Sequence, residues 1–179
     1  MAAKKTLRVA MIGPLGGASL APGMIKMTNQ IQSWKLEGYL IQARFFNWSA
    51  WESAADWLNG ADIRVACGYS NGGSSVTWIP WGDADTPAAK LDLLIGLDPT
   101  IWIKPSLIPS NVKKAVCYYN ANWFILVPTQ WVGHAKYYLT DDNKSTNLIT
   151  KTIWDWHGAV DSNPQRQAEI YSMIRALIK

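Results

Sequence analysis

Short apolar runs alternate with longer stretches in which apolar residues recur at helical spacing. The apolar runs predict strands over 6–12, 39–46, 63–67, 91–97 and 112–119. The longer stretches predict helices over 22–36, 49–58 and about 163–178, with a further helix from Ser70 to about Pro80. Strands separated by helices favour right-handed crossovers and a mostly parallel sheet. We therefore expect an α/β fold, a three-layer sandwich around a sheet of about five strands, with residues 1–179 as one domain.

Local signals mark the ends of the expected helices. Ser49 is a candidate N-cap, and Glu52 three residues later predicts a capping box at the start of the second helix. Gly60 is expected to end that helix. Between the fifth strand and the last helix the pattern is less regular, and it is compatible with short strands, in a hairpin, over 124–127 and 148–154.

A Gly-x-Ser-x-Gly motif follows the third expected strand, in a strand–turn–helix setting. The strand ends at Gly68-Tyr69-Ser70-Asn71-Gly72, and small residues able to begin a helix come next. A serine on such a turn is strained, so Gly68 and Gly72 supply the small neighbours that it needs. We expect Ser70 Oγ to stand above the carboxyl edge of the sheet, near the N–H groups that begin the next helix. An ordinary serine in a glycine-rich turn would show the same sequence pattern. The motif therefore indicates a nucleophile only together with a base and a residue that orients the base.

A serine nucleophile requires a base and a group that orients the base. Asp98 directly follows the apolar strand 91–97 and is expected at the carboxyl edge, although an aspartate before proline is also a common turn former. The base is His134 or His157. We favour His157, because its loop precedes the closing helix and returns to the carboxyl edge. The resulting order of Ser, Asp and His is the one used in α/β-hydrolases.

An oxyanion hole needs backbone N–H groups close to the reacting oxygen. Asn71, the residue after the serine, is expected to supply one of them. The loop Gly13-Pro14-Leu15-Gly16-Gly17 after the first strand is expected to supply the other. Pro14 has no N–H, so Leu15 is the expected donor and Gly16 the second choice.

With these motifs the chain resembles the α/β-hydrolase superfamily, and specifically its small lipase-like and esterase-like members from bacteria and phages. The resemblance covers most of the chain. It rests on five segments in family order, namely Gly13–Gly17, Gly68–Gly72, Leu97-Asp98-Pro99-Thr100, Val116-Cys117-Tyr118-Tyr119-Asn120 and His157.

The resemblance implies a carboxylic-ester hydrolase with Ser70, Asp98 and His157 as a catalytic triad and with no metal or cofactor. The oxyanion loop departs from the family pattern at two positions. Gly13 stands where the family often has histidine, and Pro14 where it has glycine. Resemblance in fold does not identify the substrate, which is expected to be a small-molecule, lipid or glycan ester.

The chain has 11 tryptophans, several of them in expected loops. They either fill the core and anchor loops or form an aromatic rim suited to acyl chains or sugar faces. Trp102, Trp123 and Trp131 are expected to contact substrate, and the long segment 123–154 is expected to roof an apolar pocket partly. Two alternatives stay open: an esterase or deacetylase acting on envelope polysaccharide, and a catalytically silent binding protein with the same fold.

Composition narrows the remaining function classes. Hydrophobic residues make up 49% of the chain, and the net charge of +4 comes from scattered basic residues, so we expect no nucleic-acid partner. Cys67 and Cys117 lie in expected buried strands and should be reduced. The two histidines and two cysteines show no metal-ligand spacing. The chain shows no signal peptide and no run long enough to span a membrane, so a cytoplasmic location is expected, with release by another route left open. The sequence leaves the oligomeric state open.

Overall fold

The central element is a six-stranded sheet in which all neighbouring strands run parallel. The structure is a computed structural model that describes residues 3–100, 106–121 and 133–178. The strand order is β2-β1-β3-β4-β6-β8. The strands are β1 (Lys5–Ile12), β2 (Tyr39–Phe46), β3 (Ile63–Tyr69), β4 (Leu93–Leu97), β6 (Lys114–Asn120) and β8 (Asn147–Ile153). A separate pair is formed by β5 (Leu107–Ile108) and β7 (Tyr138–Leu139).

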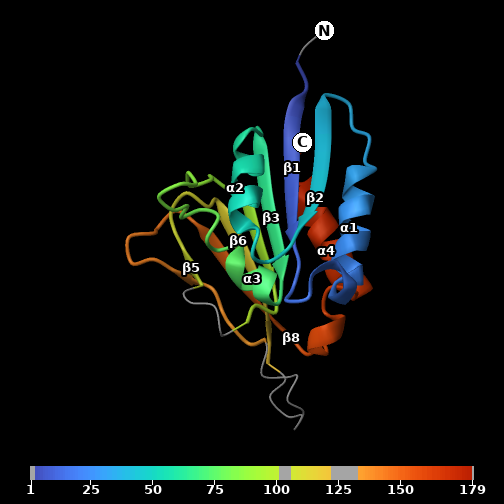
Figure 1. The fold of residues 1–179 in the computed structure, drawn as a ribbon, viewed down its shortest axis with the longest axis vertical. Coiled ribbons are helices and arrows are strands. Elements are labelled where there is room, and N and C mark those ends of the chain that lie inside the picture. Colours follow the sequence, from blue (N-terminus) through green and yellow to red (C-terminus); the bar gives the residue numbers. More distant parts are fainter. Residues whose placement is uncertain (1–2, 101–105, 122–132, 179) are drawn as a thin grey trace.

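Helices cover both faces of this sheet. The helices are α1 (Pro22–Gln32), α2 (Trp51–Asn59), α3 (Asn71–Ser75) and α4 (Pro164–Arg175), with short 3₁₀ turns η1 (Gly17–Leu20) and η3 (His157–Ala159). Successive residues of a strand point to opposite faces, and β1 shows the consequence. Its Val9 packs in one buried cluster with residues of α1 and α4, whereas its Ala10 packs in the other with residues of α2. Figure 1 shows α1 and α4 together on one side of the sheet and α2 on the other.

This architecture confirms the expected three-layer α/β arrangement but corrects the number of strands. The sheet has six strands instead of about five, because β8 joins its edge. β8 pairs in parallel with β6, from Lys114 opposite Asn147 to Asn120 opposite Ile153. Exposed and partly buried residues mix along β8, because an edge strand buries little on either face. The other expected strand, 124–127, lies outside the described residues, so the expected hairpin stays a prediction.

Two expected helix features are wrong. The N-cap of α2 is Ala50, which makes no side-chain cap bond, so Ser49 and Glu52 form no capping box there. Ala50 N–H instead donates to Asn47 O at 2.9 Å, which shifts the start of the helix. α3 ends at Ser75 rather than near Pro80. The Thr77 hydroxyl donates to a carbonyl three residues back, an interaction that competes with continued α-helix.

The chain order places a topological switch point between β1 and β3. From β1 the chain passes to β2 on one side, and β3 pairs with β1 on the other. Ligands of open parallel sheets bind beyond the carboxyl ends of strands at such a switch point. The loop after β1 and the turn after β3 meet here, since a Cβ on Gly72 would come within 2.5 Å of Gly13 O. These ends of β1 and β3 lie toward the lower part of Figure 1.

Candidate active site

Ser70 occupies a sharp turn between β3 and α3. Its φ of 58° lies in the left-handed region that non-glycine residues rarely adopt. The turn is closed so tightly that a Cβ on Gly68 would lie 2.1 Å from Gly72 O, so only glycine fits at that position. Ser70 N–H donates to Leu97 O at 3.0 Å, which ties the turn to the end of β4. This is the strand–turn–helix geometry that the Gly-x-Ser-x-Gly spacing predicts.

Three of the predicted site residues meet at this turn. His157 Nε2 lies 3.1 Å from Ser70 Oγ, and His157 Nδ1 lies 2.6 Å from Asp98 Oδ2. Asp98 follows β4 and is fully buried, Ser70 is 3% exposed, and His157 begins η3. The imidazole thus bridges a hydroxyl and a buried carboxylate. In this arrangement the ring can accept the hydroxyl proton while the carboxylate stabilises the resulting imidazolium.

Asp98 is held by further donors besides His157. Its Oδ1 accepts a hydrogen bond from His134 N–H at 3.0 Å, and its Oδ2 has a longer contact, 3.4 Å, with Asn120 Nδ2. Gly133 packs so closely that a Cβ there would lie 2.5 Å from both carboxylate oxygens. A buried carboxylate needs such partners, because an unpaired charge in the interior is costly.

The loop that carries His157 is also fixed by side chains. Tyr69 O–H donates to His157 O at 2.6 Å, and the two rings lie 5.4 Å apart between centroids. Burial raises the pKa of Tyr69 strongly, and the negative charges of Asp161 and Asp98 raise it further. The hydroxyl therefore stays protonated and remains a donor at neutral pH. Asn120 Nδ2 donates to Asp155 O in the same loop.

Backbone strain is concentrated at this site. Among the described residues, the non-glycine residues with positive φ are Ser70, Asp98 and His134. All three belong to the hydrogen-bonded group just described. Unfavourable backbone conformations persist only where the surroundings enforce them, and they gather at functional sites. The strain therefore marks the same place as the side-chain geometry.

The two histidines have different contacts in the structure. His157 lies between Ser70 and Asp98, as favoured from the sequence. The ring of His134 instead has its Nδ1 2.7 Å from Asn120 O, while its backbone N–H contacts Asp98. Sequence reasoning missed this backbone donor and the roles of Tyr69 and Asn120. The only signals were that Tyr69 precedes the serine and that Asn120 ends an apolar strand.

The expected oxyanion residues lie directly after the carboxyl ends of β1 and β3. Asn71 is the first residue of α3 and is buried. Leu15 is 55% exposed, and Gly16 has a φ of 90° that favours glycine. The contact of Gly72 with the end of β1 brings this loop beside the serine turn. That Asn71, Leu15 and Gly16 bind an oxyanion stays a prediction.

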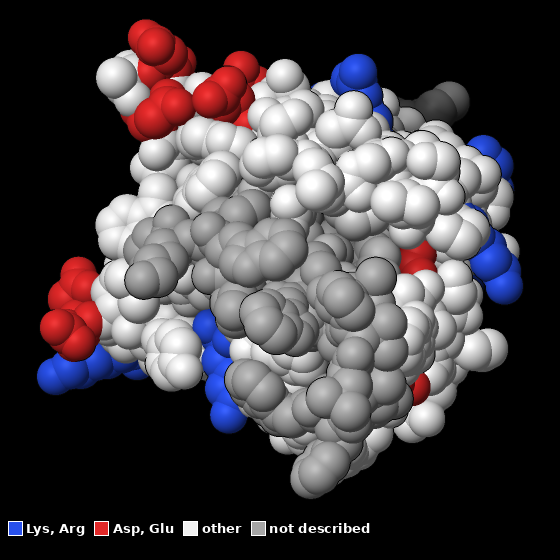
Figure 2. All heavy atoms as spheres, turned by 60° about the horizontal axis from the view of Figure 1, so that its bottom comes forward, with Lys and Arg blue, Asp and Glu red and all other residues white. Residues whose placement is uncertain are grey.

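The expected substrate contacts of Trp102, Trp123 and Trp131 lie outside the described residues, and so does the part 123–132 of the expected roof. The rest of that segment, 133–154, is described, and there the expectation of a roof is wrong for β8, which is a strand of the central sheet. Of the described tryptophans, Trp154 and Trp156 are exposed and closely precede His157, whereas Trp34 is buried. Figure 2 turns this end of the molecule forward. On its described part, acidic and basic side chains lie mostly toward the margin, and uncharged residues predominate.

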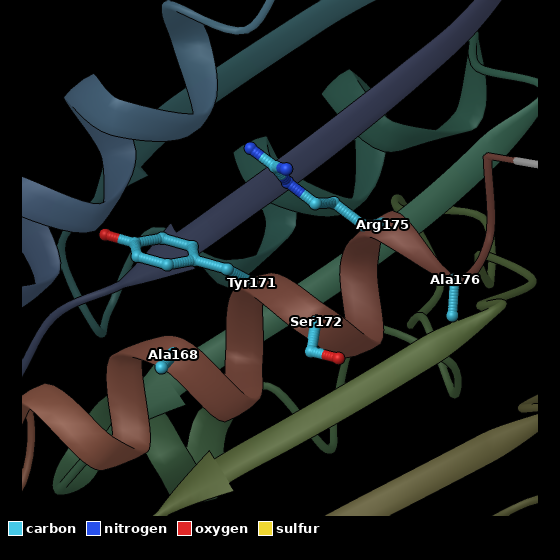
Figure 3. A pocket seen from close by; sticks show the side chains of 5 residues that line it. All are labelled: Ala168, Tyr171, Ser172, Arg175 and Ala176. Atoms are coloured by element: carbon cyan, nitrogen blue, oxygen red, sulfur yellow. The ribbon is translucent and has the colours of Figure 1, made fainter.

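A second hollow lies along α4, apart from the Ser70 site. It is lined by Ala168, Tyr171, Ser172, Arg175 and Ala176, as Figure 3 shows. The Arg175 guanidinium lies 4.6 Å from the ring centroid of Trp34, and the Tyr171 ring packs edge-on against the same indole. None of the Ser70, Asp98 and His157 side chains lines this hollow.

The described residues contain no group of three or more His, Cys, Asp or Glu side chains placed to hold a metal ion. No described helix is long and apolar enough to cross a membrane. Comparison of the chain with protein-family models and with curated protein sequences gave no match.

Proposed function

We propose that this protein is a serine hydrolase of the α/β-hydrolase type that cleaves carboxylic esters through an acyl-enzyme. The observation that carries the proposal is the continuous hydrogen-bonded line from Ser70 Oγ through His157 to Asp98 Oδ2. Both contacts have the lengths that nucleophile–base and base–orienter pairs require. The strained serine turn at the switch point between β1 and β3 supports the same proposal.

Each residue of the line has one task in the proposed reaction. Ser70 Oγ attacks the acyl carbon while His157 Nε2 takes the hydroxyl proton. Asp98 holds the proton on Nδ1 and stabilises the imidazolium. His157 then gives its proton to the leaving alkoxide. In the second half, water attacks the acyl-enzyme with His157 again as base, and Ser70 regains its proton.

Backbone N–H groups are assigned to the developing oxyanion. Asn71 N–H would act from the first turn of α3, and Leu15 N–H, or that of Gly16, from the loop after β1. Losing one such donor typically costs about 3 kcal/mol of transition-state stabilisation. The loop has Pro14 without an N–H, so the contribution from this side rests on the two residues that follow it.

The substrate is proposed to be an uncharged ester with an acyl chain or a sugar. Trp154 and Trp156 are exposed near His157, and indole rings suit contact with either group. A glycan ester of an envelope polysaccharide is the second candidate that the same tryptophans support. A series of nitrophenyl esters from acetate to palmitate, together with acetylated oligosaccharides, distinguishes the two.

Covalent labelling tests the proposal directly. A fluorophosphonate probe should label the wild-type protein at Ser70, and labelling should disappear in Ser70→Ala. Ser172→Ala is the matched control, since this serine lines the hollow along α4. The control variant should label like the wild type. Absence of labelling and of ester turnover in a folded wild-type protein would favour a silent binding protein instead.

A further inference from the structure

The proposed base and the carboxylate that orients it follow strands that are not neighbours in the sheet. Asp98 follows β4, and the loop to His157 follows β8, but β6 lies between these strands in the sheet. The last residue of β6 is Asn120, which pairs with Ile153 at the end of β8. On the other side, Asp98 N–H donates to Tyr118 O of β6 at 2.8 Å. Asn120 therefore stands between the two strand ends that must cooperate.

The side chain of Asn120 contacts both of these ends. Its Nδ2 donates to Asp155 O, two residues before His157, and lies 3.4 Å from Asp98 Oδ2. An amide nitrogen carries two hydrogens, so one group can serve both acceptors. Asn120 is 2% exposed, so water does not compete freely for these bonds.

The far side of Asp155 is anchored as well. Its carboxylate accepts from Asn163 Nδ2 at 2.8 Å and from Arg166 Nε at 3.3 Å, which ties it to the start of α4. Asn120 thereby connects the buried carboxylate of Asp98 to a segment that is fixed on the closing helix. Asp155, two residues before His157, is thus held by Asn120 through its carbonyl and by the start of α4 through its carboxylate.

The backbone of Asn120 supports Asp98 by a second route. Asn120 O lies 2.7 Å from His134 Nδ1, and His134 N–H donates to Asp98 Oδ1 at 3.0 Å. Both oxygens of Asp98 are thus linked to the same residue, one directly and one through His134. His134 holds a strained φ of 75° in doing so.

From this arrangement we infer that Asn120 is a positioning residue, which fixes the His157 loop relative to Asp98. The inference rests on the proposed hydrolase function. Leucine would leave buried oxygens without a donor, and aspartate would place a second acceptor beside Asp98, so neither can replace the amide. Asn120 acts through its neighbours and is assigned no contact with substrate.

Asn120→Ala tests the inference against a matched control. Asn143 is equally buried, and its Nδ2 donates to Ile108 O and Thr146 Oγ1, both at 2.8 Å, in the turn before β8. That turn lies at the opposite end of β8 from the His157 loop. Asn143→Ala thus removes the same kind of side chain and two donated hydrogen bonds away from the site, together with the bonds that Asn143 Oδ1 accepts from the backbone N–H groups of Ser145 and Thr146.

Two readouts separate positioning from general stability. The first is ester turnover, where N120A should lower kcat about tenfold to a hundredfold with little change in KM, since small misplacements of reacting groups cost this much. The second is the low-field proton resonance of the His157–Asp98 hydrogen bond, assigned by its loss in His157→Gln. In N120A this resonance should shift or broaden. N143A should keep both kcat and the resonance, even where it lowers the melting temperature.

The outcomes distinguish the inference from the function on which it rests. A wild-type protein without turnover would refute the hydrolase proposal, whereas the resonance would still test the position of His157. If N120A keeps wild-type kcat and an unchanged resonance, the inference is wrong. Equal losses in N120A and N143A would also overturn it, because they would reflect stability alone. Should N120A not fold, Asn120→Ser keeps one donor in a smaller side chain and is expected to show an intermediate loss.

Discussion

His157 Nε2 lies 3.1 Å from Ser70 Oγ, although 87 positions separate the two residues in the chain. The loop after β8 brings His157 back to the serine turn. Tyr69, the residue before Ser70, donates a hydrogen bond from its hydroxyl to the carbonyl of His157. The serine turn therefore helps to fix its own proposed base. This coupling makes the proposed machinery sensitive to single substitutions in predictable ways.

Replacing the proposed nucleophile should abolish turnover and leave the fold intact. Ser70→Ala removes the attacking oxygen but keeps the turn, since alanine is no larger than serine. Rates of ester hydrolysis should fall at least a thousandfold, to what the oxyanion donors and binding alone provide. Steady-state assays and circular dichroism on the same preparation measure both effects. A variant that retains wild-type turnover would exclude Ser70 as the nucleophile.

The two histidines should differ sharply in their importance. His157→Gln removes the proposed base and should lower kcat by roughly a hundredfold to ten-thousandfold. His134→Gln keeps the backbone N–H that contacts Asp98 and should lower kcat much less. Parallel kinetics on the two variants make the comparison. A larger loss of kcat in His134→Gln than in His157→Gln would indicate that His134, in the segment before β7, is the base.

The role proposed for Asn71 belongs to its backbone, and its side chain should be dispensable. Asn71→Ala keeps the N–H at the start of α3, so turnover should stay within a few-fold of the wild type. Its buried Oδ1 makes no hydrogen bond with any described residue, so removal should leave the melting temperature unchanged or raise it. Kinetics and thermal unfolding check both points. A loss as large as that of S70A would show that the side chain takes part.

Both cysteines should be free but slow to react in the folded protein. Cys67 and Cys117 are unpaired and pack in the two different core clusters, on opposite faces of the sheet. Burial raises the pKa of the Cys117 thiol to about 12 and that of Cys67 still further, so neither is a thiolate at neutral pH. Thiol titration should find two groups in denaturant without reductant and little reaction before unfolding. Fewer than two groups in denaturant would contradict this.

Asp161 should make stability depend on pH. Its carboxylate accepts from Met24 N–H at 3.0 Å. Burial raises its pKa in the folded protein, and hydrogen bonds from Met24 and Ser162 offset this only in part. The folded state therefore holds this proton to higher pH than the unfolded state does. Its contribution to stability is present below the unfolded pKa and is lost as pH rises through the folded one.

Asp161→Asn keeps the shape and an acceptor but does not titrate. The difference in melting temperature between variant and wild type should therefore shift in favour of the variant as pH rises from about 3 toward neutrality. Thermal unfolding at a series of pH values measures this difference. A difference that stays constant or shifts toward the wild type would contradict the raised pKa.

Local features could be predicted from the sequence because they depend on neighbouring residues. The turn at Ser70 follows from Gly68 and Gly72, since backbone approaches there leave no room for a Cβ. The layered fold follows from strand-length and helix-length apolar periodicity. The position of Asp98 at the carboxyl edge follows from the apolar strand before it. These features are determined by sterics and burial over a few residues.

Only the tertiary structure decided how distant segments meet. β8 joins the sheet in parallel beside β6 because of backbone pairing that its partly exposed residues do not reveal. The separation of His157 from His134 depends on which loop folds back over the sheet. The donors from Asn120 and His134 depend on the strand order β4-β6-β8. Periodicity along the chain records which residues are buried but not which of them become neighbours, so the network around Asp98 emerged only from the fold.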